Sequence, residues 1–455
     1  MDFSGAVKIK VIHVGLKKLK PTQILASGFA FLIFVGGVLL SLPTASKSGQ
    51  SVGFLNALFT ATSAVCVTGL VVADTYTQFS IFGQIVIMSL IQMGGLGIMT
   101  MATLVFLLLG KKITLRERLV MQEALNQLTL SGLVKLTRRI LLITITFEGV
   151  GAILLSIRFT QLYGLGRGLY YGLFHAVSAF NNAGFDLIGG FRNLTPFVED
   201  PIINIVIMSL IVFGGLGFSV IHDILSTRDF KRLSLHSKVV ITMTGVLLFS
   251  GFILFYLLEY SNPKTLGLLS PLGKVLAAAF QSVTPRTAGF NTLSLTDLTM
   301  PSKYLTILLM FIGASPASTG GGIKTSTFAS IIMMVYTVLA SKEDVEIYQR
   351  RIPADNIFKA AVIAVISIML VFVSSFLLTV TEQADFLPIL FETTSAFGTV
   401  GLSLGITSEL TNFGKIIIML TMFAGRVGPL TLAMALGSRV NKALIKFPEE
   451  RILVG

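Results

Sequence analysis

Residues 58–70, which read L-F-T-A-T-S-A-V-C-V-T-G-L, decide the predicted fold because the chain repeats their pattern three more times. The later copies are L-F-H-A-V-S-A-F-N-N-A-G-F at 173–185, A-A-F-Q-S-V-T-P-R-T-A-G-F at 278–290 and L-F-E-T-T-S-A-F-G-T-V-G-L at 390–402. The third copy is the least regular, with Ala279 in a column that holds phenylalanine in the others. All four align on one glycine, at intervals of 115, 105 and 112 residues: Gly69, Gly184, Gly289 and Gly401. Such regular similarity indicates a structural unit used four times.

The composition around these segments is that of a membrane protein. Of 455 residues, 53% are apolar and 13% are charged, about half the charge of a typical soluble chain. This excludes a soluble enzyme, a nucleic-acid-binding module and a disordered protein. The single cysteine, Cys66, excludes a disulfide framework and a cysteine-based metal cluster.

Eight stretches are long and apolar enough to be predicted as membrane-spanning helices. An even number places both termini on the same side of the membrane. The N-terminal stretch is longer than the apolar core of a signal peptide, so it is predicted as the first span. The eight spans are 22–41, 79–109, 140–160, 202–225, 239–258, 304–339, 357–380 and 413–436.

The basic residues orient these spans. Of 35 lysines and arginines, 24 lie in the two tails and in the even-numbered connections. Positive charge collects in cytoplasmic loops, so both termini are predicted to be cytoplasmic. The net charge of +13 is thereby explained by topology and the lipid bilayer, with no nucleic-acid partner.

Each aligned segment lies between two spans and is too short to cross the bilayer, which favours a re-entrant element. The predicted fold is therefore an all-α polytopic membrane protein with four parallel span–pore loop–span repeats around a central ion pore. Glycine-rich runs at 94–97, 214–217 and 425–428 also recur, although close helix packing explains such glycines equally well. The predicted parts are a tail at 1–21, repeat 1 at 22–110, a cytoplasmic connection at 111–136, repeats 2, 3 and 4 at 137–226, 236–340 and 356–438, and a tail at 439–455.

Four re-entrant segments around one axis would bring extended backbone to a common centre. Non-helical backbone at membrane depth must be buried or line a water-filled path, and rings of carbonyl oxygens can replace the hydration shell of a cation. Arg286 is expected to point away from this axis, toward the outer surface or the carbonyl end of a short helix. The predicted filter residues are Cys66, Val67, Thr68, Gly69, Asn181, Asn182, Ala183, Gly184, Arg286, Thr287, Ala288, Gly289, Gly398, Thr399, Val400 and Gly401.

The fourfold pattern, the single glycine in each loop and a broken sixth span resemble the Trk/Ktr/HKT superfamily of potassium transporters. With eight spans, the chain is most similar to the KtrB-type membrane subunits of bacterial Ktr systems, over residues 21–444. In that family four filter glycines go with potassium. The resemblance implies potassium uptake across the bacterial cell membrane, possible activation by sodium, a homodimer, and a cytoplasmic ring of nucleotide-binding (RCK-type, KtrA-like) regulatory subunits. No nucleotide is expected to bind this chain.

The sixth span cannot be a continuous helix, because Pro316 and three successive glycines interrupt it. A plain kink is the alternative to a loop. The resemblance implies an intramembrane loop that gates the pore beneath the filter. Arg426, deep in the eighth span, is expected to hold this loop closed through its carbonyls, and packing alone is the alternative. Lys324 either anchors the loop or extends toward solvent. The predicted gate residues are Gly313, Ala314, Ser315, Pro316, Ala317, Ser318, Thr319, Gly320, Gly321, Gly322, Lys324 and Arg426.

Three further buried polar residues, Glu148, His175 and Glu392, are expected to be structural, with Glu392 hydrogen-bonded behind the filter. A secondary cation symporter of sodium or potassium is the first competing function, although such carriers often have inverted repeats. A membrane-embedded enzyme is the second, and no metal-binding or catalytic motif supports it, so the chain is expected not to be an enzyme.

Overall fold

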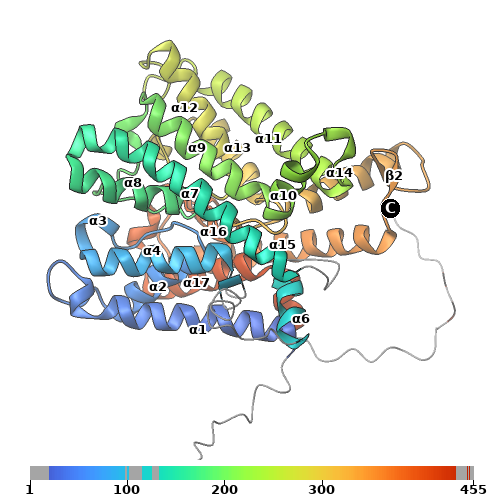
Figure 1. The fold of residues 1–455 in the computed structure, drawn as a ribbon, viewed down its shortest axis with the longest axis horizontal. Helices are drawn as coiled ribbons and strands as arrows, with labels where there is room; N and C mark the ends of the chain where they lie inside the picture. The colour runs from blue at the N-terminus through green and yellow to red at the C-terminus, as the bar shows by residue number, and fades with distance from the viewer. Residues whose placement is uncertain are drawn as a thin grey trace, which may run out of the picture.

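The structure, a computed structural model of the chain, describes residues 20–97, 100–101, 115–124, 133–436, 448 and 450. Most of the described chain is helical, which confirms the predicted all-α class. In the described part a single hairpin pairs β1 (Glu346–Ile347) with β2 (Arg350–Arg351). Most helices lie side by side, and the hairpin lies at the right-hand end of the molecule (Figure 1).

In the described part of the chain four unbroken helices are long and apolar enough to cross a membrane, and each begins one of the four sequence units. They have 21, 31, 25 and 28 residues, and 20 helical residues already span about 30 Å. About a third of each apolar window is buried inside the protein, so much of each helix surface is left for lipid. These helices are α1 (Pro21–Ser41), α7 (Leu133–Tyr163), α11 (Leu235–Glu259) and α15 (Ala354–Thr381).

A shorter helix follows each long one and packs against it. With 12 to 16 residues these helices are too short to cross the bilayer. Their last turns are buried, as the re-entrant prediction requires. They are α2 (Phe54–Val65), α8 (Leu165–Phe180), α12 (Pro271–Val283) and α16 (Phe386–Gly398).

The irregular third copy has a simple structural explanation. Phe280 is fully buried, like Phe59, Phe174 and Phe391. It lies nine residues before its glycine, whereas the other three phenylalanines lie ten residues before theirs. The third segment is therefore one residue shorter, and the gapless alignment placed Ala279 in the phenylalanine column.

The third helices of the four units are α4 (Ile81–Leu96), α9 (Pro201–Leu216), α13 (Met300–Phe311) and α17 (Asn412–Val427). In the second and fourth units this helix is shorter than the predicted span. The spans predicted at 202–225 and 413–436 are bent rather than continuous helices. The chain turns by 95° at Gly217 into α10 (Phe218–Thr227), and by 96° at Gly428 into α18 (Pro429–Leu436). Both glycines have a φ of 94°, a backbone conformation that ends a helix and that glycine adopts without strain.

The sixth span is broken, as predicted: residues 312–324, here called the interrupting loop, separate α13 from α14 (Thr325–Leu339). The remaining short elements are η2 (Pro43–Ala45), α3 (Thr75–Gln78), α6 (Leu115–Ala124), η3 (Thr195–Phe197), η4 (Phe230–Arg232), η5 (Leu295–Asp297) and η6 (Ile406–Glu409). The predicted tails at 1–21 and 439–455, the second half of the span predicted at 79–109 and part of the 111–136 connection lie largely outside the described residues. The predicted repeat boundaries stay predictions.

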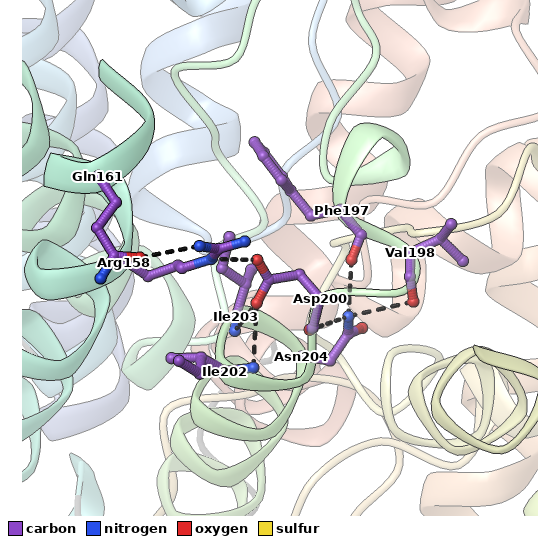
Figure 2. A network of polar contacts seen from close by, with 8 residues as sticks. All are labelled: Arg158, Gln161, Phe197, Val198, Asp200, Ile202, Ile203 and Asn204. Atoms are coloured by element: carbon purple, nitrogen blue, oxygen red, sulfur yellow. Dashed lines mark hydrogen bonds and ion pairs between the residues drawn. The ribbon is translucent and has the colours of Figure 1, made fainter. Parts of the chain in front are cut away.

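Polar contacts at one end of three units tie the first helix to the third. In the second unit, Arg158 of α7 forms an ion pair with Asp200, whose other carboxylate oxygen caps the backbone N–H groups of Ile202 and Ile203 at 3.1 Å (Figure 2). Figure 2 also shows Asn204, which donates to the carbonyls of Phe197, Val198 and Asp200. The pair thus anchors the start of α9 to the end of α7.

The third and fourth units instead use a carboxylate at the end of the first helix: Glu259 is the last residue of α11, and Glu382 directly follows α15. Glu259 accepts from the backbone N–H and hydroxyl of Thr299 at 2.8 and 2.7 Å. Glu382 accepts from the same two groups of Thr411 at 3.0 and 2.6 Å. Each threonine is the N-cap of the third helix, so in these units one acidic residue fixes the angle between the two helices.

Candidate functional site

The four glycine segments, 66–69, 181–184, 286–289 and 398–401, have the same unusual backbone. In each, the residue two positions before the glycine has a positive φ, which is uncommon for residues other than glycine. These angles are 50° at Val67, 57° at Asn182, 69° at Thr287 and 51° at Thr399. The glycines themselves have φ of 89°, 70°, 78° and 93°. The sequence similarity therefore corresponds to one local structure, built four times.

A hydroxyl group of the preceding short helix braces each glycine segment. In two segments it accepts from the backbone N–H of the glycine, and in two it donates to the carbonyl of the following phenylalanine. The pairs are Ser63 with Gly69, Ser178 with Phe185, Thr284 with Phe290, and Ser395 with Gly401. Sequence reasoning did not assign these hydroxyls a role, although three of them are serines in one column of the alignment.

The four segments meet around one centre. A methyl group placed on any of the four glycines would come closer than 3 Å to the backbone oxygen that precedes the next unit's glycine. These contacts run from the first unit to the second, third and fourth and back to the first: Gly69 with Ala183, Gly184 with Ala288, Gly289 with Val400 and Gly401 with Thr68. The cycle places four carbonyl groups beside four residues that have no side chain, and only glycine leaves that space open.

A cavity of about 380 Å³ lies against one side of the four glycines. Its lining includes the carboxylates of Asp74 and Asp186 and the guanidinium of Arg192. Burial and the nearby Asp74 carboxylate raise the pKa of Asp186 to about 6, although the backbone N–H of Ile188 favours the ionised form. The cavity therefore holds two acidic groups, one of which titrates near neutral pH.

The interrupting loop lies against the other side of the segments. Gly321 N donates to Thr399 Oγ1 at 3.0 Å. A methyl group on Gly320 would strike the hydroxyl of Thr287, and one on Gly321 would strike that of Thr399. The loop is thus in direct contact with the third and fourth glycine segments.

Hydrogen bonds from neighbouring helices hold the interrupting loop in place. Ser315 N donates to Gly215 O at 3.0 Å, and Phe218 N donates to Ala317 O at 2.9 Å, so the loop docks where α9 bends. Lys324 Nζ donates to Gly320 O at 2.6 Å. Of the two alternatives for Lys324, this contact favours anchoring of the loop.

Arg426 connects the loop to the first unit. One guanidinium nitrogen donates to the carbonyl of Thr319, within the predicted gate, and the other donates to the carbonyls of Gly94 and Gly95 at the end of α4. The guanidinium also lies 6.0 Å from the ring centre of Phe29. The loop contact agrees with the predicted geometry, whereas the α4 carbonyls were not foreseen.

The repeated glycine runs have a packing role. A methyl group on Gly94, Gly214 or Gly425 would strike the last carbonyls of the same unit's short helix. These carbonyls belong to Val65, Phe180 and Phe397. Close helix packing, which the sequence left as an alternative, therefore describes these three positions.

The remaining predicted polar residues point away from the centre. Arg286 is buried, and its Nη2 donates to Thr244 of α11 at 3.4 Å, rather than reaching the outer surface or the carbonyl end of a short helix as predicted. Glu392 accepts from Ser403 at 2.7 Å and from Thr407, so it ties α16 to the loop after the fourth glycine. His175 forms a hydrogen bond with Tyr171 O at 2.7 Å through Nδ1 and accepts from Leu187 N at 3.4 Å through Nε2. Both ring nitrogens therefore have partners within the fold, as expected for a structural residue.

Comparison with known proteins places these features in a family. A family model described as TrkH, cation transport protein, matches residues 21–441. The chain is 48% identical to "Ktr system potassium uptake protein B" of Bacillus subtilis, over 96% of this chain and 97% of that one. It is 43% identical to the protein of the same name from Vibrio alginolyticus, over 95% and 94%. It is 41% identical to "Potassium/sodium uptake protein NtpJ" of Enterococcus hirae, over 96% and 98%.

A solved structure has the same fold. The potassium transporter TrkH of Vibrio parahaemolyticus superposes with a TM-score of 0.73, covering 93% of this chain and 86% of that one. The two sequences are 17% identical, so the likeness establishes the arrangement of the helices and not the ion.

Proposed function

Because the chain belongs to the TrkH family of cation transport proteins, we propose that it takes up potassium across the bacterial cell membrane through a channel-like pore. The observation that carries this proposal is the closed cycle of contacts among Gly69, Gly184, Gly289 and Gly401. Two relatives that align over nearly their full length are named as potassium uptake proteins, which supports potassium as the cargo.

The proposed selectivity filter is the set of four glycine segments. Backbone carbonyls such as those of Thr68 and Ala183 take the place of water around a dehydrated cation. The short helices end just before these segments, so their partially negative C-terminal ends face the same centre and favour positive charge. The cavity with Asp74 and Asp186 is the outer entrance, where carboxylates raise the local cation concentration.

The proposed gate is the interrupting loop with Arg426. The loop contacts two glycine segments directly, so an ion leaving the filter must pass it. Arg426 holds Thr319 of the loop against Gly94 and Gly95 of the first unit, and its charge adds an electrostatic barrier. Lys324 fixes the far end of the loop through Gly320. Opening requires these hydrogen bonds to break.

The proposed regulation and assembly rest on membership of the family. Two relatives are named as protein B of a Ktr system, which supports a second component. We expect a cytoplasmic nucleotide-binding ring, a homodimer of this chain, and both termini in the cytoplasm. Activation by sodium is expected on the same ground.

A sodium- or potassium-coupled symporter is the second candidate. The observation that favours it is a relative at 41% identity whose name includes both potassium and sodium uptake. Reconstitution in liposomes separates the two. A pore predicts potassium flux down its own gradient without a second ion, whereas flux that stops unless sodium moves with potassium would overturn it.

Rescue of a bacterium that lacks potassium uptake tests the cargo itself. We expect growth at low potassium, stronger when the matching regulatory subunit is co-expressed, with sodium varied independently. No growth with either arrangement, despite normal amounts of protein in the membrane, would count against potassium uptake.

A further inference from the structure

Three polar side chains from three helices meet behind the second glycine segment. Asn181, which begins the segment, is completely buried. Its Nδ2 donates to Glu148 Oε1 of α7 at 2.8 Å, to Gln92 Oε1 of α4 at 2.9 Å and to Val177 O at 2.9 Å. Gln92 Nε2 in turn donates to Glu148 Oε2 at 3.2 Å. The three side chains form a closed triangle of hydrogen bonds.

This triangle joins two units of the protein. Gln92 belongs to the first unit, whereas Glu148 and Asn181 belong to the second. Asn181 Oδ1 has no hydrogen-bond partner, so the side chain is held through Nδ2 alone. Oδ1 lies against Gly95, where a methyl group would strike it. The position of Asn181 is therefore set by Glu148 and Gln92 on one side and by the backbone of α4 on the other.

The other three glycine segments lack such a triangle of hydrogen bonds. The column of Asn181 holds Cys66, Arg286 and Gly398 in the other copies. Cys66 and Gly398 have no charged side chain, and Arg286 donates to a threonine hydroxyl on α11. Among the four glycine segments, only the second has a first residue that is hydrogen-bonded to a carboxyl group. The second segment is therefore held by different chemistry from the other three.

The chemistry of the triangle requires a carboxylate at one corner. Both neighbours of Glu148 present N–H groups to it, and a carboxylate accepts at both oxygens without a donor of its own. An amide at position 148 would turn an NH₂ group toward one of these donors. Rotating Gln92 to relieve that contact would remove the acceptor that Asn181 uses. One hydrogen bond of the triangle is lost either way.

We propose that Glu148 is a positioning residue that sets the preference for potassium over sodium by holding Asn181, and with it the second glycine segment, at a fixed distance from the pore axis. The proposal rests on the proposed function of residues 181–184 as one quarter of the filter. Asn182, with its positive φ, follows directly, so a displacement of Asn181 reorients the carbonyls that lead to Gly184. Selectivity depends on the placement and number of such carbonyls.

A swap of the two side chains tests the proposal. Glu148→Gln and Gln92→Glu are each expected to lower the ratio of potassium to sodium uptake about tenfold, because each breaks a hydrogen bond of the triangle. The double variant returns the carboxylate to the triangle at position 92. There it accepts from Asn181 and from the amide introduced at position 148, so the uptake ratio should recover to within about twofold of the original, by the same conversion. The readout is paired potassium and sodium uptake in proteoliposomes that contain the full chain.

Two control variants separate the possible failures. Thr144→Val, on the same helix, removes a buried hydroxyl that has no partner and should leave the ratio unchanged. Gly184→Ala places a methyl group against Ala288 O and should lower the ratio if the segment is a filter. An unchanged ratio in Glu148→Gln together with a lowered one in Gly184→Ala would overturn the role of Glu148 alone. Unchanged ratios in both would overturn the filter as well, and a double variant as poor as the singles would exclude positioning through the triangle.

Discussion

The guanidinium of Arg426 donates a hydrogen bond to the carbonyl of Thr319, so α17 of the fourth unit holds the loop that interrupts the third. The same side chain reaches the carbonyls of Gly94 and Gly95 in the first unit. One residue therefore joins three of the four units directly beneath the glycine segments.

Replacement of Arg426 should open the pore. Arg426→Ala removes the donors that hold Thr319, and potassium flux without a regulatory subunit should rise about tenfold, since a hydrogen bond to a charged group contributes about 1.5–3 kcal/mol. Flux is measured as potassium release from loaded proteoliposomes. Lys415→Ala on the same helix removes a contact with Asn56 far from the loop and serves as the control. Flux equal to or below the original in Arg426→Ala would contradict a gating role.

Alanine substitutions at two glycines of the first unit separate the effect of backbone strain from the effect of altered filter geometry. Gly69 and Gly53 have nearly the same φ, 89° and 86°, a conformation that residues with side chains rarely adopt, so alanine at either position costs about 1–3 kcal/mol of backbone strain. A methyl group on Gly69 would strike Ala183 O, whereas one on Gly53 meets nothing within 4 Å. We expect Gly69→Ala to abolish discrimination between potassium and sodium, and Gly53→Ala to lower the melting temperature without changing that discrimination. Equal discrimination in the two variants would remove Gly69 from the filter.

The ion pair in Figure 2 should matter for stability rather than for ion choice. Asp200→Ala removes both the N-cap of α9 and the partner of Arg158, at a cost of about 1–3 kcal/mol in unfolding free energy. Asp200→Asn keeps a good cap and loses only the charge. Its melting temperature in detergent should therefore lie between those of the unmodified protein and Asp200→Ala. Asp229→Ala, an exposed cap of the short helix η4, is the matched control. A change in the potassium-to-sodium uptake ratio in Asp200→Asn would argue against a purely structural pair.

The outer cavity should respond to external pH through Asp186. Burial raises the pKa of this carboxyl to about 6, from a usual value of 3.8. Below pH 6 the group is protonated and the cavity loses a negative charge, so the apparent KM for potassium should rise as external pH falls from 7 to 5, about one unit to either side of that pKa. Asp186→Asn should show the high KM at all pH values. A pH dependence that survives in Asp186→Asn would assign it to another group.

The raised pKa of Asp186 also affects the stability of the fold, and here low pH is favourable, whereas it is unfavourable for potassium binding. The folded protein holds this proton more tightly than the unfolded chain does, so the contribution of Asp186 to stability is greatest at low pH. It is lost as pH rises from 3.8 to about 6. Thermal unfolding of the original protein and of Asp186→Asn across this range measures the difference.

Much of the arrangement around the centre could be predicted from local patterns. Aligning the four copies on Gly69, Gly184, Gly289 and Gly401 required only that identical local structures come from similar residues, and the structure brings all four glycines together. The break in the sixth span followed from Pro316 and the adjacent glycines, because backbone chemistry alone excludes a continuous helix there. The bends at Gly217 and Gly428 were missed, since one glycine within an apolar stretch is compatible with a straight helix.

What the sequence determined by itself was the membrane class, the fourfold unit and the residues at its centre, because hydrophobicity, repetition and backbone permissiveness are properties of neighbouring residues. The tertiary structure alone decided which distant groups meet: Arg426 with Gly94 and Gly95, Glu148 with Asn181 and Gln92, and Gly321 with Thr399. Most buried polar groups have a hydrogen-bond partner, but the local sequence does not say which group that partner is. That choice depends on how the units pack, because a hydrogen bond forms only between atoms brought within about 3 Å of each other.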